Sequence, residues 1–153
     1  LMEQKIAFLR RNFLFRDLSF QEMARVLKVV HEVSYREGET IFAEGETGDD
    51  FFIVVSGHVS VAAGGKILTE VDPGGHFGEL ALVLSPVRSA TVTAKDRLRL
   101  LRFSRRDFEA LVREEPVLAN KLLVCMLQNV GTRVRELSRD YTNVLKENER
   151  QKR

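Results

Sequence analysis

The residues best suited to chemistry lie in one glycine-rich segment near the middle of the chain. Gly74, Gly75 and Gly78 precede an apolar run that is predicted to be helical over residues 80–84. A helix N-terminus presents unpaired backbone N–H groups and the positive end of a dipole, which favours an anion. Arg88 follows closely, and its planar guanidinium suits bidentate recognition of a phosphate. This segment is therefore predicted to bind an anion.

Glu79 adds a carboxylate beside the same predicted helix start. An anion site normally excludes a carboxylate that has no partner of its own. A ligand with both a phosphate and a hydroxyl would account for Arg88 and Glu79 together. Alternatively, Glu79 only complements the helix dipole and forms a salt bridge with Arg88. The residues alone leave both interpretations open.

Short strand-type runs separated by glycines surround this segment. Glycines supply the turns and bulges that such strands need, and Gly64-Gly65 is typical of a hairpin turn. Many short strands at this spacing predict a barrel or sandwich. The predicted strands cover residues 40–43, 51–56, 58–62, 67–71, 89–94 and 98–103.

Helical patterns flank the strands on both sides. Ser19 and Glu22 form a predicted capping box at the start of a second N-terminal helix. Ser104 is predicted to cap a short helix, and Pro116 to open a long one over residues 117–146. The predicted organisation is a single domain with an N-terminal helical segment (residues 1–33), a β-roll (34–103) and C-terminal helices (104–153).

The apolar residues of the last helix form a heptad seam. They step alternately by four and three residues, which is the a/d pattern of a coiled coil. The first turns are expected to pack on the chain's own barrel. Beyond Arg135 a domain of this size has little left to cover the seam, so a homodimer through this helix is predicted. The seam consists of Leu123, Leu127, Val130, Val134, Leu137, Tyr141 and Val144.

Composition excludes several classes of protein. The 153 residues are 44% hydrophobic and 30% charged, the balance of a globular domain, and no run approaches the ~18 apolar residues of a membrane span. A net charge of +2 is too small for a nucleic-acid-binding surface, and one cysteine fits a reducing cytoplasm. The three histidines are scattered and no nucleophile–base pair is evident, so neither a metal or other cofactor nor an enzymatic activity is predicted.

Two blocks of sequence resemble the cyclic-nucleotide-binding domains of cAMP receptor protein, protein kinase A regulatory subunits and cyclic-nucleotide-gated channels. Phe-Gly-Glu-Leu-Ala-Leu at residues 77–82, followed by Arg-Ser-Ala-Thr-Val at 88–92, is similar to their phosphate-binding cassette (77–92). The resemblance covers about residues 8–137 and implies a mainly β fold: a jelly-roll-like β-roll with N-terminal helices, a short cassette helix and a long C-terminal helix. The second block comprises Ile41, Gly45, Gly48, Asp49, residues 51–54 and Gly57.

The resemblance also implies roles for individual residues. Glu79 would accept a hydrogen bond from the ribose 2′-hydroxyl, and Arg88 would clamp the cyclic phosphate. Ser89 favours cAMP as the ligand, with cGMP as the alternative, and Phe42 is expected to affect packing rather than the site. Backbone N–H groups around the phosphate would come from Gly78, Leu80, Ala81, Ser89 and Ala90, and base contacts from Asn129, Thr132 and Arg133, the last by stacking.

The function implied is a non-enzymatic sensor in which ligand binding repositions the C-terminal helix. A second possibility is that the chain is the effector portion of a larger transcription regulator, kinase or channel with an unidentified downstream partner. No helix-turn-helix follows the last helix in this sequence, so DNA binding by the chain itself is not expected. A cupin-like metalloenzyme is a third possibility, but its clustered histidine ligands are missing from the sequence.

Overall fold

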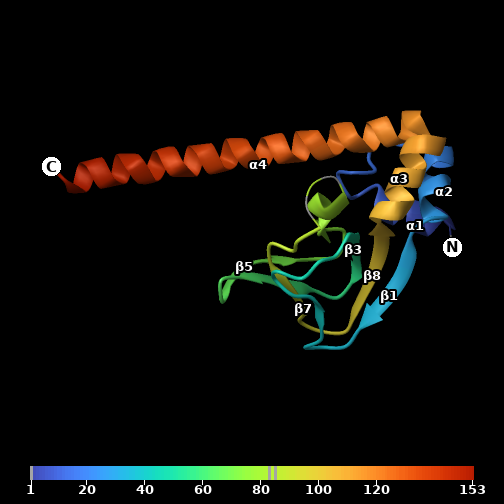
Figure 1. Ribbon diagram of the computed structural model, residues 1–153, viewed down its shortest axis with the longest axis horizontal. Coiled ribbons are helices and arrows are strands. Elements are labelled where there is room, and N and C mark those ends of the chain that lie inside the picture. Colours follow the sequence, from blue (N-terminus) through green and yellow to red (C-terminus); the bar gives the residue numbers. More distant parts are fainter. Residues whose placement is uncertain (1, 83, 85) are drawn as a thin grey trace.

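Two antiparallel sheets form the body of the protein, and a long helix extends away from it (Figure 1). The computed structural model describes residues 2–82, 84 and 86–153. The sheets have strand orders β1-β8-β3-β6 and β2-β7-β4-β5, which confirms the predicted mainly β fold with helices at both ends. The elements are α1 (Met2–Leu9), α2 (Phe20–Leu27), β1 (His31–Tyr35), β2 (Thr40–Phe42), β3 (Asp50–Ser56), β4 (Val59–Ala63), β5 (Lys66–Val71), β6 (His76–Phe77), the 3₁₀ helix η1 (Glu79–Leu82), β7 (Thr91–Ala94), β8 (Leu98–Ser104), α3 (Arg105–Glu114) and α4 (Pro116–Gln151).

The apolar run in β3 is buried on both faces of its sheet. Side chains alternate between the faces of a strand, so Phe51 and Ile53 point one way and Phe52 and Val54 the other. Phe51 and Ile53 join a cluster that also contains residues of the N-terminal segment, α3 and α4. Phe52 and Val54 join a second cluster with residues of β4, β7 and β8. The sheet is therefore covered by helices on one face and by the other sheet on the opposite face.

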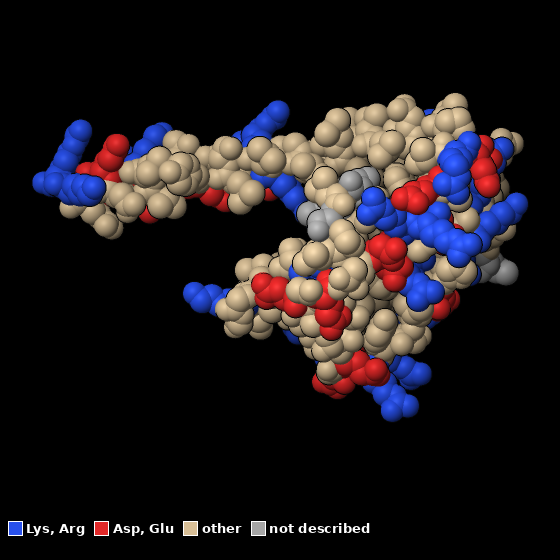
Figure 2. Space-filling view, in the orientation of Figure 1, with Lys and Arg blue, Asp and Glu red and all other residues tan. Residues whose placement is uncertain are grey.

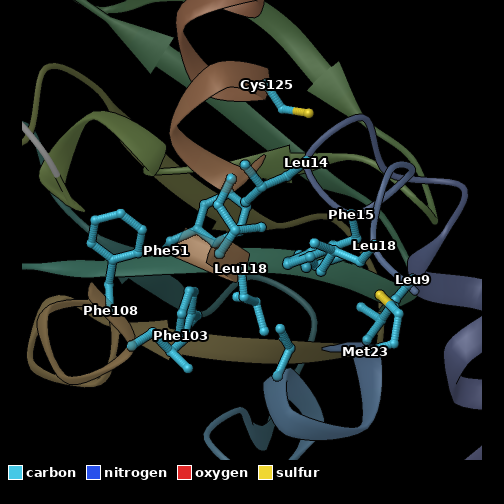
Figure 3. Packing of buried hydrophobic residues seen from close by; sticks show 14 of the residues in the cluster. Leu9, Leu14, Phe15, Leu18, Met23, Phe51, Phe103, Phe108, Leu118 and Cys125 are labelled. Carbon is cyan, nitrogen blue, oxygen red and sulfur yellow. The ribbon is translucent and has the colours of Figure 1, made fainter. Parts of the chain in front are cut away.

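Figure 3 shows the cluster on the helical side. Leu14, Phe15 and Leu18 from the N-terminal segment lie near Phe51 of β3 and Leu118 of α4, and all five side chains are buried. Removing apolar surface of this kind from water stabilises a fold by about 25 cal/mol per Å². The cluster joins parts of all three segments that the sequence distinguishes into one core.

The N-terminal helical segment ends earlier than predicted. The capping box is confirmed, because Ser19 Oγ accepts from the Glu22 amide at 3.1 Å and Glu22 Oε1 accepts from the Ser19 amide at 2.9 Å. The boundary at residue 33 is wrong, since β1 starts at His31 and pairs antiparallel with β8. Pairing with a strand almost 70 residues away overrides the local helical pattern.

Helix α4 starts at Pro116 as predicted but continues to Gln151, beyond the expected residue 146. Its buried residues are not those of the heptad seam: Leu118, Ala119, Leu122, Cys125 and Met126 face the body, while every seam residue is between 36% and 72% exposed. All residues from 131 onward are exposed, and Figure 2 shows this half of the helix standing clear of the body. The seam is a second apolar face.

Among the described residues, no helix is both long enough and apolar enough to cross a membrane.

Candidate functional site

Backbone hydrogen bonds fix the position of Arg88 between two segments that are distant in sequence. The Arg88 amide donates to the Glu46 carbonyl at 2.8 Å, and the Gly45 amide donates to the Arg88 carbonyl at 2.8 Å. The Gly48 amide donates to the Pro86 carbonyl at 2.7 Å. The loop before β3 therefore holds the arginine in place from both sides.

The Arg88 side chain is only 6% exposed and makes few contacts that satisfy its donors. Nη2 donates to the Asp50 carbonyl at 2.8 Å, and the guanidinium carbon lies 4.0 Å from the centre of the Phe42 ring. Nε is buried without a hydrogen-bond partner among the described residues. Burial lowers the pKa of Arg88, but an arginine stays protonated in proteins. A buried cation with an unused N–H donor suits an anionic ligand.

Two glycines leave the space that this guanidinium occupies. A Cβ at Gly48 would lie 2.9 Å from Arg88 Nε. A Cβ at Gly78 would lie 2.9 Å from Arg88 Nη1 and from the Asp50 carbonyl, and Gly78 also has a φ of +80° that favours glycine. Gly48, known from the sequence only as part of a pattern, is therefore a residue of the site.

The expectation that Phe42 affects packing rather than the site is wrong. Its ring lies against the Arg88 guanidinium in a cation–π contact and lines the same cavity. Phe42 also packs on Phe52 and Phe77, so it contributes both to the core and to the positioning of the Arg88 side chain. A contact between residues 46 positions apart gives no local signal in the sequence.

The Glu79 carboxylate is 6% exposed and forms an ion pair with a residue of α4. Its Oε1 lies 2.7 Å from Arg133 Nη1 and 3.8 Å from His76 Nε2. Burial raises the pKa of Glu79, whereas His76 and Arg133 lower it, and the net pKa is below the ordinary value. Glu79 is therefore ionised at neutral pH. Its ion-pair partner is Arg133 and not Arg88, which sets aside the alternative of a Glu79–Arg88 salt bridge.

The cassette helix is shorter than predicted. A 3₁₀ helix covers Glu79–Leu82, in place of the helical run expected over residues 80–84, and residues 83 and 85 lie outside the described part of the chain. The Ala81 amide, expected to bind the phosphate, donates to the Gly78 carbonyl at 3.2 Å. A single 3₁₀ turn offers little helix dipole, so Arg88 supplies most of the positive charge of the site.

Arg88 and Glu79 line one cavity of about 660 Å³, a volume typical of small-molecule sites. The residues that line it belong to strands β2, β4, β5, β6 and β7, to the segment between β6 and β7, and to α4. Of the residues predicted to bind ligand, seven line this cavity: Gly78, Glu79, Ala81, Arg88, Ser89, Ala90 and Arg133.

Three further predicted residues are placed differently. Asn129 and Thr132 are not among the described residues that line the cavity. The Thr132 hydroxyl donates to the Gln128 carbonyl of its own helix at 3.0 Å, and Asn129 Nδ2 is buried with no hydrogen-bond partner in the described residues. The side chain of Leu80 lies outside the description.

A β-roll with a buried arginine and a buried carboxylate in one cavity has the features of a small-molecule-binding module. No group of three or more metal-ligating side chains occurs within the ranges that the structure describes. Residues 32–115 match the family model of the cyclic nucleotide-binding domain. The chain belongs to this family.

Solved structures agree with the family. The N-terminal domain of a transcriptional regulator from Streptomyces coelicolor A3(2) superposes with a TM-score of 0.77 at 29% identity, over 85% of this chain and 94% of that one. The catabolite activator protein of Thermus thermophilus gives 0.71 at 30% identity, over 83% and 62%. The regulatory domain of Toxoplasma gondii PKA, co-crystallised with cAMP, gives 0.66 at 32% identity, over 71% and 43%. The chain is thus similar to the N-terminal domain of a transcriptional regulator and to a regulatory domain of PKA.

Proposed function

We propose that the chain is a non-enzymatic cyclic-nucleotide sensor that binds cAMP in the 660 Å³ cavity. One observation carries the proposal: Arg88 and Glu79 line the same cavity without pairing with each other. Arg88 donates to the Asp50 carbonyl, and Glu79 forms an ion pair with Arg133. A cyclic nucleotide needs both, because its phosphate is an anion and its ribose 2′-hydroxyl is a donor. The buried Nε of Arg88 would donate to the phosphate.

The remaining contacts follow from the residues that line the cavity. The phosphate is proposed to accept hydrogen bonds from the backbone N–H groups of Gly78, Leu80, Ala81, Ser89 and Ala90. The Ala81 amide would first have to break its hydrogen bond to the Gly78 carbonyl. Arg133 is proposed to contact the base, since it is the predicted base residue that lines the cavity. Asn129 and Thr132 would reach the base only after a movement of α4. The Toxoplasma gondii domain with cAMP supports cAMP over cGMP.

Helix α4 is proposed to report the binding of the ligand. It contacts the cassette through the 2.7 Å ion pair between Arg133 and Glu79, the same carboxylate that is proposed to bind the ribose. A ligand that binds one position of α4 more tightly shifts the population towards that position. The similarity to the Streptomyces coelicolor domain supports a role as the sensor part of a transcription regulator. A kinase or channel is the alternative, the downstream partner is unidentified, and DNA binding by this chain is not proposed.

The exposed seam of α4 is proposed to pair with a second copy of the chain. Residues of an α-helix advance by about 100° each, which places the seam roughly a quarter of a turn from the stripe that packs on the body. A partner helix would therefore reach the seam without displacing the domain. Soluble monomers rarely keep an apolar stripe of this length in water. A cytoplasmic location is proposed from the single, unpaired Cys125.

Replacing the ribose 2′-hydroxyl by hydrogen is expected to weaken binding. The Glu79 carboxylate would lose an accepted hydrogen bond in a buried site, at a cost of about 1–3 kcal/mol, or roughly 5- to 150-fold in Kd. Isothermal titration calorimetry of cAMP and 2′-deoxy-cAMP measures this ratio. In Glu79→Gln the ratio should fall towards one, because an amide is a weaker acceptor than a carboxylate. Glu136→Gln on the exposed part of α4 is the matched control and should keep the wild-type ratio. Equal affinities of the wild type for both ligands would contradict the ribose assignment.

A further inference from the structure

A buried asparagine from the N-terminal segment contacts the wall of the cavity. Asn12 is 2% exposed, and its Oδ1 accepts from the Leu14 amide at 3.0 Å. Its Nδ2 lies 3.3 Å from both the Gly74 carbonyl and His76 Nδ1. The amide orientation is set by these partners, since only the oxygen can accept from Leu14 and only the nitrogen can donate to Gly74.

This contact determines which nitrogen of His76 carries the proton. Nδ1 faces an NH₂ group, which only donates, so Nδ1 accepts and the neutral ring is protonated at Nε2. The ring is held between Phe13 and Phe51, with centroid distances of 4.6 and 5.7 Å. Its orientation is therefore fixed by packing as well as by the hydrogen bond.

The resulting N–H group faces the carboxylate of Glu79, which is proposed to bind the ribose. His76 Nε2 is buried, has no hydrogen-bond partner among the residues described, and lies 3.8 Å from Glu79 Oε1. His76 lines the same cavity as Glu79 and Arg88. A separation of 3.8 Å exceeds a hydrogen bond, and a shift of less than 1 Å by the carboxylate would close it.

We propose that His76 is a positioning residue for Glu79, with Asn12 holding it as an Nε2–H donor. The inference rests on the proposed binding of ribose by Glu79. When the 2′-hydroxyl draws the carboxylate into place, Nε2–H donates to it and fixes its orientation. Asn12 also links the N-terminal helical segment to the ribose end of the cavity. His76 would thus raise the preference for ribose over deoxyribose without touching the ligand.

The test compares two substitutions at His76 by calorimetry with cAMP and 2′-deoxy-cAMP. His76→Phe keeps an aromatic ring between Phe13 and Phe51 but removes the donor, and should lower the ribose-to-deoxyribose affinity ratio by about 2- to 10-fold. His76→Gln places an amide N–H near the position of Nε2 and should restore most of the ratio. A merely structural role predicts the reverse order, since phenylalanine packs better than glutamine.

Long-range ¹H–¹⁵N NMR of the wild type provides a readout that does not depend on a variant. It should show the Nε2–H form of His76, and Asn12→Ala should give a mixture of the two neutral forms. A wild-type ring protonated at Nδ1, or a His76→Phe protein that keeps the wild-type ratio, would overturn the proposal. A wild type without any preference for ribose would instead overturn the proposed role of Glu79.

Discussion

Replacing Arg88 with alanine is expected to weaken cyclic-nucleotide binding by about 10- to 150-fold. Hydrogen bonds to a charged group contribute about 1.5–3 kcal/mol, and each 1.4 kcal/mol is roughly tenfold in affinity. The substitution should affect ligand binding more than folding, because among the described residues the Arg88 side chain makes one hydrogen bond, to the Asp50 carbonyl. Calorimetric titration of the variant with cAMP measures the loss, and circular dichroism checks the fold.

Two further variants separate the charge of Arg88 from its placement. Gly48→Ala keeps the arginine but puts a Cβ 2.9 Å from its Nε, so it should also weaken binding by displacing the guanidinium. Gly131→Ala adds the same methyl group where nothing lies within 4 Å, and Arg106→Ala removes an exposed arginine on α3. Both should bind like the wild type. A folded Arg88→Ala protein with unchanged affinity would contradict the proposal that Arg88 binds the phosphate.

The double variant Val134→Asp, Leu137→Asp is expected to convert a dimer into a monomer. Burial of a valine or leucine contributes about 1.5–3 kcal/mol per side chain, before the cost of association is subtracted. The variant would also place charges in the centre of the seam. Analytical ultracentrifugation should give twice the chain mass for the wild type and the chain mass for the variant. Arg139→Asp with Asn143→Asp, on the opposite face of α4, is the matched control and should remain a dimer.

The seam also indicates how the two helices would pair. Asn148 continues the spacing of Leu127, Val134 and Tyr141, and an asparagine at this position of a coiled coil favours one register. In a parallel, in-register pair, Glu147 of each chain would lie near Lys152 of the other. A wild type that sediments as a monomer at tens of micromolar, with and without nucleotide, would contradict the dimer.

Features that depend on neighbouring residues were predictable from the sequence. The Ser19 capping box, the Ser104 cap, the Gly64-Gly65 hairpin and the start of α4 at Pro116 are all confirmed. Each is determined within a few residues by backbone geometry or a local hydrogen bond. Local physical chemistry is sufficient for such elements.

Contacts between distant segments were not predictable in the same way. Strand β1 forms because β8 pairs with it. The Arg88 side chain is positioned by Phe42, Gly48 and Asp50, which come from an earlier part of the β-roll. Residue type and spacing pointed to Arg88 and Glu79, and the resemblance to a family supplied their roles. Neither predicted these neighbours or the pairing of Glu79 with Arg133. Such contacts depend on the packing of the whole domain, which no local pattern in one sequence records.

Calorimetric titration of the wild-type chain with cAMP and cGMP tests the central claim most directly. The cavity with Arg88 and Glu79 predicts saturable binding at one site per chain. The proposed function further predicts that cAMP binds more tightly than cGMP. Adenosine, which keeps the base and the ribose but lacks the phosphate, should bind far more weakly because Arg88 has no anion to contact. Absence of binding heat with both cyclic nucleotides, confirmed by an unchanged melting temperature in their presence, would contradict the account.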